Sequence, residues 1–156
     1  MGMINQNLWH TFRSFLDGAY DERLLDIYAD ETKISYQRER YINAIKKFEQ
    51  CYNPGDVELF SAPGRSEIGG NHTDHQRGHV LAAAVNLDTL AAVRENGTQQ
   101  IRILSQGYPM CVVELSRLEP VAEEVNSTPA LIRGVAARFH QLGCRVGGFD
   151  AYCTST

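Results

Sequence analysis

A chain of 156 residues, of which 43% are hydrophobic and 22% charged, has the size and composition of one globular domain. Its formal net charge of -4 at pH 7 argues against the basic surface of a nucleic-acid-binding protein, so no nucleic-acid partner is expected. Its apolar runs are too short to span a bilayer and its N-terminus has no signal-peptide pattern, so we expect no membrane partner and a cytoplasmic location.

The N-terminal third of the chain has the pattern of helices. The clearest helix is predicted at residues 35–51, with Ser35 as its capping residue, and a weaker one at residues 21–29. In the first of these, apolar residues recur at helical spacing, at Tyr41, Ile42, Ile45 and Phe48. The other side of this helix is predicted to carry the basic residues Arg38, Arg40, Lys46 and Lys47. A turn at residues 53–56, NPGD, ends the helical region.

From residue 57 the pattern changes to the two-residue period of β-strands. Strands are predicted at residues 57–61, 89–95, 101–106 and 111–116, with turns at Asn96-Gly97 and around Gly107. We expect these strands to form a meander. A last strand is predicted at residues 148–156, where Phe149, Ala151 and Cys153 alternate with Asp150, Tyr152 and Thr154.

A second clear helix is predicted before this last strand. Thr128 can cap it, Pro129 suits its first position, and Gly143 suits its end. Its apolar residues line one predicted face, namely Leu131, Ile132, Val135, Phe139 and Leu142.

The stretch SAPGRSEIGGNHTDHQRGH, residues 61–79, is rich in glycines and in side chains that bind protons. Glycines permit backbone conformations closed to other residues, so the stretch could fold around a ligand or form a tight turn between strands. It leads into the apolar run VLAAAV, residues 80–85, which we expect to be buried.

Several side chains in this stretch could bind a ligand. On a helix, three histidines would lie near one face and could hold a metal ion, namely His72, His75 and His79. Gly78 and Thr73 disfavour such a helix, and ordinary loop histidines are the alternative. Arg65 could stabilise a phosphoryl or carboxylate group, or form a surface ion pair. Donors and acceptors at Asn71, His72 and Asp74 suit a ligand rich in hydroxyl groups.

The string GRSEIGGNHTDHQRGHVL, residues 64–81, resembles the galactokinase signature G-R-x-N-L-I-G-E-H-T-D-Y-N-x-G-x-V-L. The positions that agree are Gly64, Arg65, Gly70, His72, Thr73, Asp74, Gly78, Val80 and Leu81. The last strand, GGFDAYCTST, resembles the strand that precedes the phosphate-binding loop in these proteins. The chain is therefore identified as similar to galactokinases, which are members of the GHMP kinase family.

The resemblance implies a fold, a reaction and a set of site residues. The fold would be the α+β, ribosomal-S5-domain-2-like N-terminal domain of GHMP kinases, truncated, at residues 55–156, preceded by a helical extension at residues 1–54. The reaction in the parent protein would be ATP-dependent phosphorylation of galactose or a related sugar at its anomeric hydroxyl, using Mg²⁺. Arg65 would stabilise charge at the transferring phosphoryl group. Sugar contacts would fall on Asn71, His72, Thr73 and Asp74.

The chain also departs from the family pattern. Asn71 replaces a glutamate, which removes a charge from the sugar contacts. Other replacements are His75 for tyrosine, Glu67 and Ile68 for Asn-Leu, and Gly69 for isoleucine. The family's Gly-rich loop and catalytic aspartate would follow Thr156, so no residue here is assigned to ATP or Mg²⁺. The alternative is a non-catalytic sugar-binding or regulatory relative.

Overall fold

The computed structural model describes residues 6–54, 57–70 and 77–156. Its helices are α1 (Gln6–Leu16), α2 (Asp21–Tyr28), α3 (Ile34–Cys51) and α4 (Thr128–Gln141), with short 3-10 turns at Glu31–Lys33 and Ala122–Glu124. Its strands are β1 (Glu58–Gly69), β2 (Leu81–Glu95), β3 (Gln100–Ser105), β4 (Cys111–Glu114) and β5 (Phe149–Ser155). The predicted helices at residues 21–29 and 35–51 are confirmed within a few residues at each end, as are the strands predicted at residues 101–106, 111–116 and 148–156. The strands predicted at residues 57–61 and 89–95 are present but longer than predicted, because β1 continues to Gly69 and β2 begins at Leu81.

The sheet has the strand order β1-β2-β5-β3-β4, so the predicted meander is wrong. The last strand, β5, enters between β2 and β3; it runs antiparallel to β2 and parallel to β3. Strands that are consecutive in the sequence, β2 and β3, are therefore not neighbours. The two-residue period identifies strands but holds no information about which distant strand completes the pairing.

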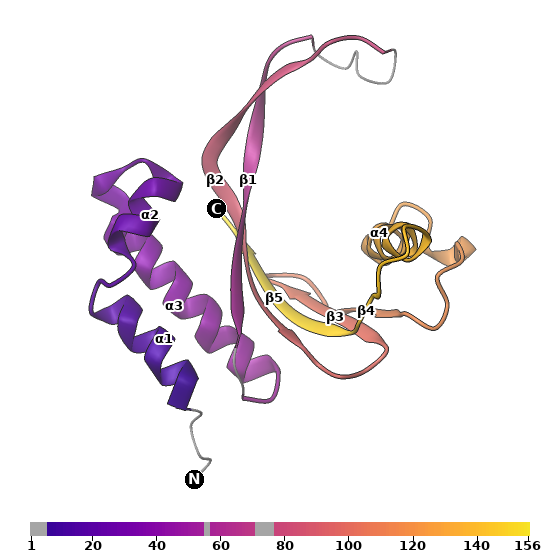
Figure 1. Ribbon diagram of the computed structural model, residues 1–156, viewed down its shortest axis with the longest axis horizontal. Coiled ribbons are helices and arrows are strands. Elements are labelled where there is room, and N and C mark those ends of the chain that lie inside the picture. The colour runs from indigo at the N-terminus through magenta and orange to yellow at the C-terminus, as the bar shows by residue number, and fades with distance from the viewer. Residues whose placement is uncertain (1–5, 55–56, 71–76) are drawn as a thin grey trace.

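Helices cover both faces of the sheet, with α1, α2 and α3 on one side and α4 on the other (Figure 1). The larger core joins the first three helices to β2 and β5, and includes Phe48, Leu90 and Tyr152. A smaller core under α4 includes Ile101, Val113 and Ala136. Because the larger core crosses residue 54, the helical region and the sheet are packed as one unit; the predicted boundary at 54 stays a prediction.

Helix α4 forms where it was predicted but packs differently. Ser127, not Thr128, is the capping residue, and its side chain accepts from the backbone N–H of Ala130. The residues it buries are Arg133 and Ala136. Much of the predicted apolar face is exposed, at Leu131, Val135, Phe139 and Leu142. Arg133 takes the inner position because its guanidinium donates to the carbonyl oxygens of Glu114 and Arg117 and to the Glu124 carboxylate.

Strands β1 and β2 form a long antiparallel hairpin whose outer half projects away from the helices and the rest of the sheet (Figure 1). The apolar run at residues 80–85 lies on this projecting half, so the expectation that it is buried is wrong: Leu81 is 63% exposed. Across the hairpin, Ile68 is 65% exposed. In the described part of the chain, no helix is long and apolar enough to cross a membrane.

Candidate functional site on the projecting hairpin

The glycine- and histidine-rich stretch lies on the projecting half of the β1–β2 hairpin, which we call the hairpin arm: residues 62–70 and 77–87. Residues 62–69 continue β1 as extended strand, so the first half of the stretch is neither a tight turn nor a helix. The arm's register shifts between Pro63 and Arg65 and again between Glu67 and Gly69. Each shift adds a local twist, which changes the direction of the side chains that follow.

Arg65 lies on the arm opposite Ala84. Its side chain is 75% exposed, and its Nη2 lies 3.8 Å from Oε1 of Glu67. An exposed pair at this distance contributes little to folding. As far as the described residues are concerned, the guanidinium can therefore turn toward an anionic ligand without the loss of a strong contact.

The other four predicted site residues, Asn71, His72, Thr73 and Asp74, lie outside the described residues, as does His75. The structure thus leaves the predicted sugar contacts and most of the histidine group as predictions. His79, the one described histidine of that group, is exposed on the arm. Among the described residues, no three or more His, Cys, Asp or Glu side chains are grouped as a metal ion would require.

Gly70 connects β1 to the segment that carries the predicted sugar contacts. Its φ is +80°, a conformation that residues with a side chain rarely adopt, and a Cβ atom there would lie 2.1 Å from the carbonyl oxygen of His79. At its neighbour Gly69, a Cβ atom would have no atom of the described residues within 4 Å. The structure therefore requires glycine at position 70, where the chain agrees with the galactokinase signature, and not at position 69, where it departs.

At the inner end of the arm, a buried polar cluster joins the hairpin to the helices. The Asp88 carboxylate on β2 accepts from the hydroxyl of Tyr28 at 2.7 Å, from the Ser61 hydroxyl, and from Nη1 of Arg40. The Tyr28 hydroxyl also lies 3.2 Å from that of Tyr41. Burial, followed by the contacts with Tyr41 and Asp88, raises the pKa of Tyr28 far above its ordinary value, so this hydroxyl stays protonated and donates.

Arg40 extends this cluster to the centre of the sheet. Its Nη2 donates to the carbonyl oxygens of Asp88 at 3.2 Å and of Thr154 at 3.1 Å. Arg40 is only 8% exposed, so its predicted place on the polar side of the helix is wrong. The burial of Arg40 could not be predicted from the sequence, because helical spacing places this residue near the boundary between the polar and the apolar face. Its burial depends on the Asp88 carboxylate, which lies far away in the sequence and compensates the buried charge.

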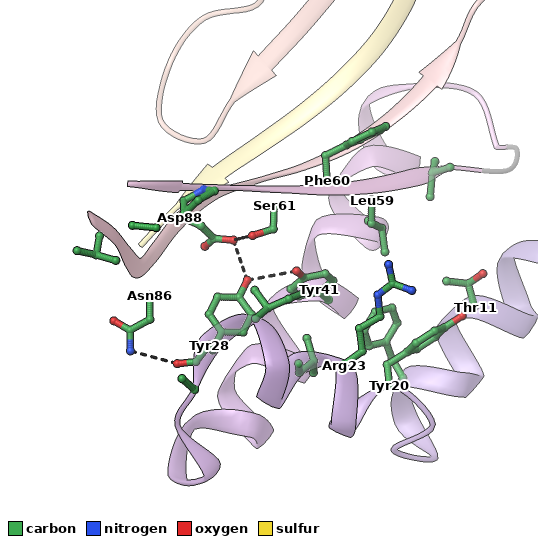
Figure 2. A pocket seen from close by; sticks show the side chains of 18 residues that line it. Thr11, Tyr20, Arg23, Tyr28, Tyr41, Leu59, Phe60, Ser61, Asn86 and Asp88 are labelled. Atoms are coloured by element: carbon green, nitrogen blue, oxygen red, sulfur yellow. Dashed lines mark hydrogen bonds between the residues drawn. The ribbon is translucent and has the colours of Figure 1, made fainter. Parts of the chain in front are cut away.

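A cavity of about 820 Å³ lies between α1, α2 and the inner part of the hairpin (Figure 2). Aromatic side chains of the helices form one wall, and the polar cluster around Asp88 lies at one end. The labelled residues around it include Thr11, Tyr20, Arg23, Phe60 and Asn86. Sequence analysis did not predict this cavity, because its two walls come from distant parts of the chain.

Comparison with known proteins shows which family this hairpin resembles. Residues 46–95, which end where β2 ends, match the family model described as the galactokinase galactose-binding signature. The chain is 29% identical over 118 residues to galactokinase from Clostridium tetani, covering 75% of this chain and 30% of that protein. It is 32% identical over 96 residues to galactokinase from Bacillus subtilis, covering 60% of this chain and 25% of that protein.

The fold agrees with a solved structure. The chain superposes on the crystal structure of Lactococcus lactis galactokinase complexed with galactose with a TM-score of 0.62 and 23% sequence identity, covering 70% of this chain and 29% of that one. The chain thus has the predicted α+β fold, which it shares with part of that galactokinase structure. Within that fold class, the chain is similar to galactokinases, and the comparisons support its match to an N-terminal portion of such a protein. It spans less than a third of the length of these relatives.

Proposed function

We propose that this chain forms the sugar-recognising part of a galactokinase-type sugar kinase, which transfers a phosphoryl group from ATP to the anomeric hydroxyl of galactose. The observation that supports it is the coincidence of the galactose-binding signature, residues 46–95, with the projecting hairpin. This hairpin presents its outer half, with Arg65, to solvent. The proposal assigns the protein to the cytoplasm, where sugars are phosphorylated with ATP.

In this proposal Arg65 acts on the phosphoryl group. A guanidinium is planar and always charged, so it can neutralise the charge that develops on the transferring oxygens. The weak pair with Glu67 leaves it available for that contact. The hydroxyl groups of the sugar would be bound by Asn71, His72, Thr73 and Asp74. With an amide at Asn71 in place of a carboxylate, we expect weaker sugar binding than with a charged acceptor.

ATP and Mg²⁺ would be bound by parts of the parent protein other than this chain. We therefore assign no ATP or Mg²⁺ contact to a residue of this chain. When bound, ATP supplies the phosphoryl group and Mg²⁺ neutralises its charge. The chain's own contribution is to bind and orient the acceptor sugar and to place Arg65 beside it.

The proposal is tested first by titrating the 156-residue chain with D-galactose while its amide NMR shifts are followed. We expect shifts confined to the arm, weaker shifts with the epimer D-glucose, and weaker binding in Asp74→Ala. Asn71→Glu should bind galactose more tightly. Failure of galactose to shift any arm amide would overturn the proposed sugar site, and galactose-dependent ADP release by the chain would overturn the assignment of ATP to other parts of the parent protein.

A chimera separates a kinase from a non-catalytic relative. The chain would replace the 118 matched residues of the Clostridium tetani galactokinase, and galactose-dependent ADP release would be measured. Turnover supports the kinase, and its loss in Arg65→Met supports the role of that residue. A chimera that binds galactose but does not turn over would favour the sugar-binding relative.

A further inference from the structure

The hairpin changes from packed to exposed at Ser61 and Asp88. Leu90 and Ala92, further along β2, are fully buried, and Asp88 is 6% exposed. Beyond these residues, nearly every described position of the arm is exposed on both strands. The direction in which the arm projects is therefore set at or below this level, because the outer half has little to pack against.

Apolar packing does not hold the arm against the helices at this level. The cavity of about 820 Å³ separates α1 and α2 from the arm, with Pro63 and Ala84 on one wall and Tyr20 and Ile27 on the other. Hydrogen bonds, rather than apolar contacts, join the hairpin to α2 here. Figure 2 shows the carboxylate of Asp88 and the amide of Asn86 both directed toward Tyr28.

The cluster binds both strands of the hairpin to the helices and to the centre of the sheet. Asp88 receives hydrogen bonds from Tyr28 of α2, from Arg40 of α3 and from Ser61 of β1. Arg40 also reaches the Thr154 carbonyl of β5. Charge-assisted bonds from a rigid guanidinium to three acceptors on two strands fix an orientation better than one bond could.

Arg65 is close to this cluster along the strand. Asp88 lies opposite Pro63, and the register shift that precedes Arg65 begins at Pro63. A small rotation at Asp88 therefore carries Arg65 with it.

We propose that Arg40 and Tyr28 are positioning residues: by holding Asp88, they fix the direction of the hairpin arm and hence the place of Arg65. This inference rests on the proposed function for its effect on sugar binding, but its effect on the arm does not. Misplacement of a binding group by about 1 Å can cost up to roughly a hundredfold in function, so a roughly tenfold loss of galactose affinity is expected when the cluster is broken.

The test compares four variants of the 156-residue chain with the unmodified protein. Asp88→Asn removes the charge, Arg40→Lys removes the guanidinium fork, and Tyr28→Phe removes one hydroxyl. Arg133→Met is the matched control, because Arg133 is as buried as Arg40 and forms an ion pair with Glu124 under α4, away from the arm. All are studied well below their unfolding midpoints, so that every sample is folded.

Two readouts are taken on each variant. Amide residual dipolar couplings of residues 65–69 and 81–84, compared with those of residues 89–95 of β2 and of β5, report the orientation of the arm. NMR titration gives the dissociation constant for D-galactose. We expect altered arm couplings and roughly tenfold weaker binding in Asp88→Asn and Arg40→Lys, a smaller effect in Tyr28→Phe, and neither change in Arg133→Met.

The remaining outcomes distinguish a failure of this proposal from a failure of the proposed function. Unchanged arm couplings in Asp88→Asn and Arg40→Lys would overturn it, as would equal changes in Arg133→Met. Altered couplings with unchanged galactose affinity would overturn the positioning of the sugar site. If the unmodified chain binds no galactose, the proposed sugar site fails, and the couplings alone still decide whether the cluster directs the arm.

Discussion

Arg102 and Asp150 lie side by side on the parallel strands β3 and β5 and are joined by two hydrogen bonds of 2.7 Å each. Asp150 is 1% exposed, whereas the Arg102 side chain is 38% exposed. Asn96 adds a third hydrogen bond to the carboxylate, at 2.8 Å. The pair therefore joins β5 to β3, which lies about fifty residues earlier in the sequence. Its carboxylate is buried, and its guanidinium is partly exposed to solvent.

This asymmetry predicts unequal effects of two substitutions that remove the same pair. Arg102→Met leaves a buried carboxylate with only Asn96 beside it, and we expect a loss of about 3 kcal/mol in the free energy of unfolding. Asp150→Asn leaves a guanidinium that can reach water, and we expect a loss of about 1 kcal/mol. Urea unfolding followed by circular dichroism measures both. Equal losses, or a larger loss in Asp150→Asn, would contradict this assignment.

Two adjacent glycines give the second prediction, which concerns the segment between the strands of the arm. Gly70→Ala would place a Cβ atom 2.1 Å from the His79 carbonyl oxygen, in a backbone conformation with φ +80°. We expect it to shift the arm amides near Val80 and to weaken galactose binding roughly tenfold. Gly69→Ala, which meets nothing within 4 Å, is the control and should change neither. Similar behaviour of the two variants in an NMR titration would argue against the geometry at Gly70.

The four cysteines should differ in reactivity. Cys51 and Cys144 are exposed, whereas Cys111 and Cys153 are partly buried. Burial raises the pKa of the thiol in both Cys153 and Cys111. A raised pKa lowers the thiolate fraction at any pH below it, and the thiolate is the reactive form. We expect iodoacetamide at pH 7 to label Cys51 and Cys144 first, with labelling of Cys153 rising as the pH is raised. Peptide mass spectrometry would contradict this if Cys153 were labelled as early as Cys51.

The ion pair under α4 predicts a pH dependence of stability. Hydrogen bonds from Arg133 lower the pKa of Glu124 below its ordinary value of 4.5. A lowered pKa means that the pair stabilises the fold fully above pH 4.5 and is lost as the pH falls through the lowered value. The difference in melting temperature between the protein and Glu124→Gln should therefore be constant near neutral pH and shrink below pH 4.5. A melting-temperature difference that grows on acidification would show that the ion pair does not lower the pKa of Glu124.

The exposed apolar face of α4 predicts self-association of the chain. Leu131 is 69% exposed and Phe139 51% exposed, and large apolar patches favour contacts between molecules. We expect sedimentation velocity to show concentration-dependent association that Phe139→Glu reduces, without loss of stability. Gln141→Glu adds the same charge to a polar position of the same helix and should leave association unchanged. Association that both variants reduce equally would point to net charge instead.

The local elements were predictable from the sequence because their signals are local. The period of Tyr41, Ile45 and Phe48 predicts α3, and the agreement at Gly64, Arg65 and Gly70 predicts the family and the region of the site. The fold class followed from that resemblance. The predicted sugar contacts on Asn71 to Asp74 remain predictions.

The tertiary structure decided what depends on distant partners. Periodicity shows that residues 149–155 form a strand, but only packing against β2 and β3 places that strand between them, and only the resulting geometry buries Arg40 beside Asp88. In the same way, the run at residues 80–85 is apolar in sequence yet exposed, because the arm carries it beyond the helices. The sequence by itself determined the elements and the family, since helix and strand periods and short motifs involve neighbouring residues. Strand order, buried charges and the direction of the arm depend on contacts between residues far apart in the chain, which no local pattern specifies.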